Sequence, residues 1–331
     1  MPLFLELVRR VSESDPDLAR DALAGLRAYA DAAPEDPPPP KPEAARVCGA
    51  TLRDHGGDGP PVVLVPSLIN PPRILDLDAE VSLAMAIAGM NRHVLLLDWG
   101  DAAERAQLGI GGHVEALLLP LLRAVGEPAA LVGYCLGGTM AMAAANLAPC
   151  ERVVTLAAPW HFRRYPDRSR AALAEIWRSS KAAAESLGAL PMEVLQGAFW
   201  SLDPDRTVRK FAEFGRLEPG SAKARRFVAL EEWANAGEPL PYPAAADLLE
   251  GMFGEDLPGR GEWRVGGRPA SERLSIPAVH LLAGRDVIAP PQTAPEGDQR
   301  TIPAGHVGMV VGRVRSELHA QLKAILDPAC R

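Results

Sequence analysis

The sequence has few features that would build a metal site, a disulfide framework or a membrane span. Its 331 residues include only four cysteines, and no two of them have the Cys-x-x-Cys spacing of a zinc or redox site. No apolar run approaches the roughly 20 residues that cross a bilayer as a helix. The first residues lack the basic and apolar regions of a secretory signal. These absences predict a cytoplasmic protein that holds no metal and no resident cofactor.

Positive charge and aromatic side chains are also scarce. The chain has 35 Lys and Arg residues against 42 Asp and Glu residues, so its formal net charge is -7 at pH 7. Nucleic-acid phosphates and anionic membrane surfaces repel a protein with this balance, and we expect no nucleic-acid partner. Aromatic residues make up 5% of the chain and hydrophobic residues 47%. This length and composition suit one large α/β domain with an insertion, or two modest domains.

A run of prolines separates the first residues from the rest of the chain. Residues 1–32 carry apolar side chains at mostly helical spacing, and we predict a helical appendage there. Residues 33–46 include four consecutive prolines, which favour an extended polyproline conformation and exclude a helix. We therefore predict that this stretch is a linker.

Beyond the linker, short apolar stretches that are typical of buried strands alternate with stretches that are typical of helices. The strands are predicted at residues 47–53, 62–65, 93–98, 129–132, 152–157, 278–283 and 299–303. A helix is predicted over residues 307–326. This alternation favours the α/β class, with a doubly wound, mostly parallel sheet that is covered by helices on both faces.

The alternation is interrupted between residues 160 and 274. The interruption is too long for a loop, and most of it has the pattern of helices. A small hairpin is expected at residues 262–269, where Gly266 and Gly267 form the turn. We predict a lid insertion over residues 160–274, within a core that is formed by residues 47–159 and 275–331.

The segment Gly-Tyr-Cys-Leu-Gly-Gly at residues 133–138 lies between a predicted strand and a helix of small residues at 139–147. This is the layout of a nucleophile elbow, where a sharp strand-to-helix turn lifts a nucleophile above the carboxyl edge of a parallel sheet. The usual form is Gly-x-Ser-x-Gly, and Cys135 takes the place of the serine. Tight packing of the helix on the strand around a buried thiol is the other interpretation of this string.

Two further residues follow later strands in the order that such a site requires, which is nucleophile, acid, histidine. Asp286 comes after the strand that ends at residue 283, and His306 comes after the strand that ends at residue 303. His306 would accept the proton of the Cys135 thiol or pair with its thiolate. Asp286 would fix the tautomer of His306 and stabilise the imidazolium. The sequence therefore predicts a Cys-His-Asp catalytic triad.

Backbone amides near the elbow are expected to form an oxyanion hole. The N–H of Leu136 follows the nucleophile directly, and a second donor would come from the loop after residue 66, at Ile69. An aspartate after a strand is often a turn former, and a Gly-His pair is often structural, when each is taken alone. Three such residues in the required order favour the triad and an α/β-hydrolase fold.

Several motifs resemble those of the polyhydroxyalkanoate synthases, and the chain is most similar to their short, class III type. The similar segments are 66–71, 74–77, 97–100, 133–138, 231–233, 265–269, 286–291 and 305–308. Together they extend over about residues 47–326, and the cysteine elbow with its flanking glycines is the most specific of them. The resemblance implies membership of the α/β-hydrolase superfamily.

The resemblance also implies an activity. In such an acyltransferase, the cysteine accepts a 3-hydroxyacyl group from coenzyme A as a covalent thioester, and the histidine activates a hydroxyl group that extends a polyester. The implied partners are an acyl-CoA, the growing polyester chain, and a second synthase subunit or a second copy of the chain. Association with polyester granules in the cytoplasm is implied as well.

One position departs from the synthase pattern. The synthases usually have a histidine directly after the catalytic aspartate, where this chain has Val287. A hydrolase with a cysteine nucleophile, either a polyester depolymerase or an acyl-CoA thioesterase, therefore remains as the alternative. A granule-associated scaffold that has kept the fold is a third, non-enzymatic possibility.

Overall fold

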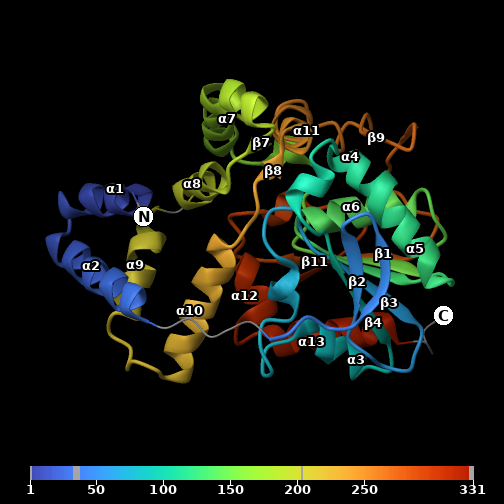
Figure 1. The fold of residues 1–331 in the computed structure, drawn as a ribbon, viewed down its shortest axis with the longest axis horizontal. Helices are drawn as coiled ribbons and strands as arrows, with labels where there is room; N and C mark the ends of the chain where they lie inside the picture. Colours follow the sequence, from blue (N-terminus) through green and yellow to red (C-terminus); the bar gives the residue numbers. More distant parts are fainter. Residues whose placement is uncertain (1, 33–37, 203, 328–331) are drawn as a thin grey trace. The chain divides into compact units, whose positions relative to one another are not determined.

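The computed structural model describes residues 2–32, 38–202 and 204–327 (Figure 1). The chain divides into two compact units. The first consists of residues 1–38 and 193–237, and the second of residues 39–192 and 238–331. The candidate site residues all lie in the second unit.

A sheet of eight strands, counted over the described residues, forms the centre of the second unit. Its strands are β1 (Glu43–Val47), β2 (Ala50–Asp54), β3 (Pro61–Val65), β4 (His93–Asp98), β5 (Ala130–Tyr134), β6 (Arg152–Leu156), β11 (Ala278–Ala283) and β12 (Asp298–Ile302). Their order across the sheet is β1-β2-β4-β3-β5-β6-β11-β12. The strands from β4 to β12 pair in parallel, whereas β1 and β2 pair antiparallel at one edge. The predicted doubly wound, mostly parallel sheet is confirmed.

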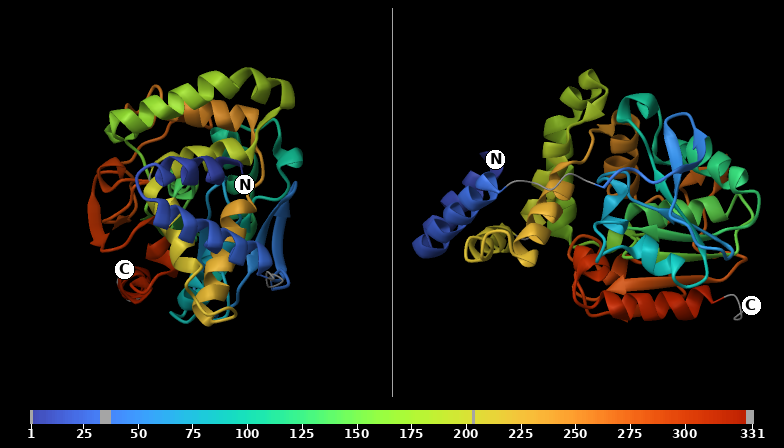
Figure 2. Two further views of the ribbon diagram at one scale, coloured as in Figure 1. Left: turned by 90° about the vertical axis from the view of Figure 1, so that its left-hand side faces the viewer. Right: turned by 60° about the horizontal axis from the view of Figure 1, so that its bottom comes forward.

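The central strands have continuous apolar sequences because helices cover the sheet on both faces. Every residue of β3, β5 and β6 is buried. Helices α4, α5 and α6 lie on one face, and α3 and α13 lie on the other (Figures 1 and 2). These helices are α3 (Leu83–Ala88), α4 (Ile110–His113), α5 (Leu119–Val125), α6 (Leu136–Ala145) and α13 (Arg315–Leu326).

Two predicted elements differ in the structure. The single strand predicted at residues 47–53 is a hairpin, because the chain turns at Cys48, whose φ is +49°, and at Gly49 between β1 and β2. Strand β1 therefore occupies the end of the predicted linker, and residues 33–37 of that linker lie outside the described residues. The helix predicted over 307–326 is two helices, α12 (His306–Val311) and α13, because Gly312 adopts an extended conformation between them.

The insertion leaves the sheet after β6 and returns to it before β11. In the second unit it contributes α7 (Asp167–Leu187), α11 (Tyr242–Ala246) and a π-helical turn at Asp247–Met252. Glu250 in that turn accepts hydrogen bonds at 2.6 Å from Trp177 Nε1 and from Lys181 Nζ of α7. The predicted hairpin is present as β9 (Arg264–Val265) and β10 (Arg268–Pro269). The mainly helical insertion is thus confirmed.

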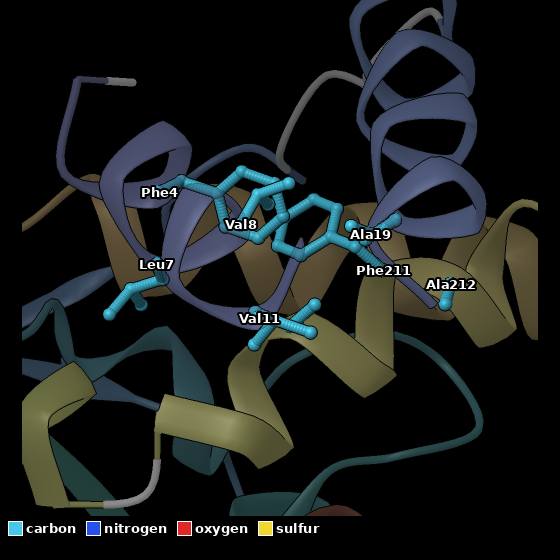
Figure 3. Close-up of a cluster of buried hydrophobic side chains, with 9 residues drawn as sticks. Phe4, Leu7, Val8, Val11, Ala19, Phe211 and Ala212 are labelled. Atoms are coloured by element: carbon cyan, nitrogen blue, oxygen red, sulfur yellow. The ribbon is translucent and has the colours of Figure 1, made fainter. Parts of the chain in front are cut away.

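The first unit is helical. It contains α1 (Pro2–Ser12), α2 (Pro16–Asp31), α9 (Pro204–Phe214), α10 (Ala222–Asn235) and most of α8 (Met192–Leu202). A hydrophobic cluster joins α1, α2 and α9 through Phe4, Leu7, Val8, Val11, Ala19, Ala22, Val208, Phe211 and Ala212 (Figure 3). The stretch predicted as an appendage therefore shares a core with part of the predicted lid. The boundaries of the four predicted segments stay a prediction.

Helices α2 and α9 are in close contact at Gly25. A Cβ atom on Gly25 would lie 1.8 Å from the carbonyl oxygen of Phe211. Replacing a helical glycine with alanine normally stabilises a protein by about 0.5–1 kcal/mol. For Gly25→Ala we expect the opposite sign, a loss of about 1–3 kcal/mol in the free energy of unfolding, because the backbone of α9 must move.

Urea unfolding measures this change. Gly308→Ala is the matched control, because Gly308 is a helical glycine whose added Cβ would have no neighbour within 4 Å. It should gain about 0.5–1 kcal/mol. If Gly25→Ala stabilised the protein as the control does, the close crossing of α2 and α9 would be wrong.

Candidate active site

Cys135 occupies the sharp turn between β5 and α6. Its backbone has φ +55° and ψ -131°, a conformation that costs a non-glycine residue about 1–3 kcal/mol. The turn is held on both sides, because Cys135 N–H donates to the carbonyl of Leu156 and Gly138 N–H donates to the carbonyl of Cys135, both at 2.9 Å. The side chain of Cys135 is partly exposed. The geometry is that of a strained elbow with an accessible thiol.

Three glycines around Cys135 allow this turn. A Cβ atom on Gly133 would lie 2.4 Å from the Cα of Gly138, and one on Gly137 would lie 2.1 Å from the carbonyl oxygen of Val65. A Cβ atom on Gly138 would lie 2.4 Å from the Cβ of Ala158. The tight packing that the sequence also suggested is therefore present, and it is the means by which the elbow is built.

Asp286 and His306 lie together at the same edge of the sheet. Asp286 follows β11, and His306 is the first residue of α12. The Oδ2 atom of Asp286 lies 2.6 Å from Nδ1 of His306. The Oδ1 atom accepts hydrogen bonds from the backbone N–H groups of Ile288 at 2.8 Å and Ala289 at 3.0 Å. These amides fix the carboxylate so that it accepts the Nδ1 proton of His306.

The charges around His306 change its pKa. Burial by itself lowers the pKa, but the charges of Asp286 and Cys135, together with hydrogen bonds to both side chains, raise it to about 10. The side chains of His306 and Asp286 are almost completely buried. The raised pKa favours the protonated, positively charged form of His306.

Two tyrosines that we did not predict as site residues lie near Cys135 and the Asp286–His306 pair. The rings of Tyr134 and His306 lie 5.0 Å apart, and the hydroxyl of Tyr134 donates to the carbonyl of His306 at 3.4 Å. Burial, and then the charges of Cys135 and Asp286, raise the pKa of Tyr165. The position of Tyr134 next to Cys135 is a signal in the sequence, whereas nothing in the sequence indicates Tyr165.

The two expected oxyanion donors differ in their surroundings. Leu136 is the first residue of α6, where backbone N–H groups have no acceptor within the helix. The N–H of Ile69 donates to the hydroxyl of Ser67 at 3.2 Å. To bind an oxyanion, Ile69 would have to exchange this acceptor. The close approach of Gly137 to the carbonyl of Pro66 places the start of the loop against the start of α6.

Neither a metal cluster nor a membrane span is found among the residues that the structure describes. Within it, no group of three or more His, Cys, Asp or Glu side chains could hold a metal ion. In the same residues, we find no helix with the length and apolarity to cross a membrane.

Comparison with solved structures identifies the fold. The enol-lactonase of Burkholderia xenovorans aligns with 88% of this chain and 100% of its own, at a TM-score of 0.54 and 17% identity. An epoxide hydrolase of Bacillus megaterium aligns with 86% of this chain and 99% of its own, at a TM-score of 0.54 and 14% identity. At these identities the likeness shows the fold alone. The chain has the α/β-hydrolase fold, as predicted.

Comparison by sequence is more specific, although no family model matches the chain. The chain is similar to proteins named poly(3-hydroxyalkanoate) polymerase subunit PhaC. It is 26% identical to that of Haloarcula marismortui (84% of this chain, 62% of the relative) and 26% identical to that of Haloferax mediterranei (76% and 55%). It is 24% identical to that of Allochromatium vinosum (78% of each chain). The resemblance to the polyhydroxyalkanoate synthases is confirmed, and the chain spans less than two thirds of the first two relatives.

The raised pKa of His306 predicts how stability depends on pH. The ordinary pKa is 6.5 and the folded value is about 10, so the proton on His306 stabilises the folded state below pH 6.5. This contribution is lost as the pH rises from 6.5 to 10. We expect the free energy of unfolding to fall over that range, by at most about 1.4 kcal/mol per pH unit from this group. The free energy of unfolding of Asp286→Asn should fall less steeply, because His306 has no paired negative charge in this variant.

Urea unfolding at intervals across this pH range measures the difference between the two curves. Asp58→Asn, which replaces an exposed aspartate, is the control and should follow the wild type. Parallel curves for the wild type and Asp286→Asn would contradict the assignment of the raised pKa to the Asp286–His306 pair.

Proposed function

We propose that this chain is an acyltransferase of the polyhydroxyalkanoate synthase type, in which Cys135 carries a 3-hydroxyacyl group. The observation that supports it most is the buried Asp286–His306 hydrogen bond of 2.6 Å beside the thiol of the elbow. The relatives named PhaC support the substrate class. Taken alone, the strained turn at Cys135 would support a nucleophile at this position but no particular reaction.

The first half of the reaction loads the cysteine. The Cys135 thiolate attacks the thioester carbonyl of a 3-hydroxyacyl-CoA, and the oxyanion is stabilised by the N–H groups of Leu136 and Ile69. The bond to the sulfur of coenzyme A then breaks. The imidazolium of His306 gives its proton to this leaving thiolate, so free coenzyme A and a neutral histidine result.

The second half transfers the acyl group. Neutral His306 takes the proton from the 3-hydroxyl group of an acceptor, whose oxygen attacks the Cys135 thioester. The new ester forms as the bond to Cys135 breaks, and the thiolate and the imidazolium are restored. Exchange of one thioester for another is nearly isoenergetic, so Cys135 keeps the acyl group reactive toward an alcohol. Asp286 holds the histidine tautomer through both halves.

The same site supports one alternative. The side chain of Val287 is exposed directly after Asp286, at the position where the synthases usually have a histidine. If water replaced the hydroxyl acceptor, the product would be a free acid. The alternative function is therefore a hydrolase with a cysteine nucleophile, a polyester depolymerase or an acyl-CoA thioesterase.

The proposal extends to partners and location. The acyl-CoA enters as a substrate, and no resident cofactor takes part. A second synthase subunit or a second copy of the chain would complete the active enzyme, in the cytoplasm or on polyester granules. These points rest on the relatives named PhaC and on the motifs that the chain shares with the synthases.

Incubation of the full chain with 3-hydroxybutyryl-CoA tests the proposal. We expect release of coenzyme A together with a polyester, and Cys135→Ala should lower the rate of release by roughly a thousandfold or more. Cys150→Ala should leave the rate unchanged, because Cys150 is buried and burial raises the pKa of its thiol to about 11.

The products of this reaction distinguish the acyltransferase from the hydrolase. Coenzyme A together with free 3-hydroxybutyrate would support the hydrolase instead. Undiminished release by Cys135→Ala would contradict both functions.

A further inference from the structure

The loop that carries the acid is bound along its length by the base of the insertion. We call residues 286–296 the acid loop and residues 160–165 the lid-base segment. The carbonyl oxygen of Thr293 accepts hydrogen bonds from the N–H groups of Trp160 at 2.7 Å and His161 at 2.9 Å. Both donors follow β6, where the insertion begins. The acid loop is thus attached to this segment by its backbone.

The side chain of Thr293 strengthens this attachment. Thr293 has an exposed fraction of 0%, and its hydroxyl donates to the carbonyl of Pro290 at 2.7 Å. Its N–H donates to the same oxygen at 2.8 Å. The buried side chain of Tyr165 also interacts with the side chain of Thr293.

An ion pair and two hydrogen bonds hold the far end of the acid loop. The Arg164 guanidinium lies 2.7 Å from a carboxylate oxygen of Glu296. His161 Nε2 lies 2.9 Å from Oε2 of Glu272, which also accepts the N–H of Glu296 at 2.9 Å. Residues from the beginning and from the end of the insertion therefore converge on the end of the loop.

Inside the loop, the position of the acid depends on the backbone. Asp286 accepts the N–H groups of Ile288 and Ala289, and the next residue is Pro290, whose carbonyl is held by Thr293. A shift at Pro290 therefore moves these amides and the carboxylate with them. We propose that Thr293, assisted by Tyr165, is a positioning residue that couples the lid-base segment to the Asp286–His306 pair.

This inference rests on the proposed role of His306, but its test needs no turnover. The titratable groups that face His306 are Asp286, Cys135 and Tyr134. A looser acid loop weakens the interaction with Asp286 and leaves the other two in place. NMR titration of the His306 ring reports that interaction directly, and His306→Asn assigns its signal.

Thr293→Val removes the hydroxyl and keeps the shape of the side chain. We expect the pKa of His306 to fall from about 10 by roughly one unit, because the paired charge moves away. Tyr165→Phe should shift it less in the same direction. The double variant should match Thr293→Val alone, because both substitutions act through one hydroxyl.

Thr155→Val is the matched control. Thr155 is also buried, and its hydroxyl hydrogen-bonds to Nδ1 of His280 at 2.9 Å, outside the acid loop. It should lower the Tm about as much as Thr293→Val does and leave the His306 titration unchanged. A lowered Tm with an unshifted titration in Thr293→Val would overturn the proposal and leave Thr293 with a structural role alone.

Two further outcomes are informative. If Thr293→Val did not fold, Thr293→Ala would decide, because it also removes the hydroxyl that bonds to Pro290 but puts no methyl group in its place, and an unshifted titration would again overturn the proposal. Failure of the acyl-transfer function would appear as absent turnover in the wild type, while the His306 titration would still test Thr293. The two failures are therefore distinguishable.

Discussion

The chain passes from a buried strand into a helix at a single residue, and the geometry of the site follows from that turn. Cys135 adopts a left-handed φ, and the glycines on either side let neighbouring backbone approach to distances that no Cβ would tolerate. The absence of a side chain at Gly137 lets the loop after β3 contact the start of α6. The same absence at Gly138 lets the end of β6 contact it. The loop after β3 and the end of β6 are thus placed by contact with the elbow.

A second constraint is the burial of charge. A buried aspartate and a buried histidine are unfavourable apart, because each loses its hydration. The pair is compensated by its own short hydrogen bond and by the amides of Ile288 and Ala289. Such compensation depends on exact placement, and this explains why the acid loop has so many hydrogen bonds to the base of the insertion. The loop and the lid-base segment therefore act as one support for the site.

The sequence predicted the parts of this arrangement that depend on local pattern. The fully apolar stretches of β3, β5 and β6 identify buried parallel strands, and residues that follow such strands meet at one edge of the sheet. From that rule we predicted that Asp286 and His306 lie close together, and the structure places them in contact. The catalytic roles of these residues, and of Leu136 and Ile69, stay predictions.

Features that depend on contacts between distant residues could not be predicted. The hairpin of β1 and β2 was missed because β1 is charged and exposed, without the pattern of a buried strand. The shared core of α2 and α9 depends on the crossing at Gly25, which no local signal indicates. Tyr165 and Thr293 are far apart in sequence and meet only because β6 and β11 are neighbours in the sheet.

The central claim is that Cys135 carries the acyl group, and peptide mass spectrometry tests it most directly. The chain is mixed with 3-hydroxybutyryl-CoA, the reaction is stopped with acid, and the protein is digested. The mass of the peptide that contains Cys135 is then measured. The account predicts a 3-hydroxybutyryl adduct on Cys135 that hydroxylamine removes, as expected for a thioester. Release of coenzyme A with the adduct on another residue, or with no adduct on Cys135 at any time of sampling, would contradict it.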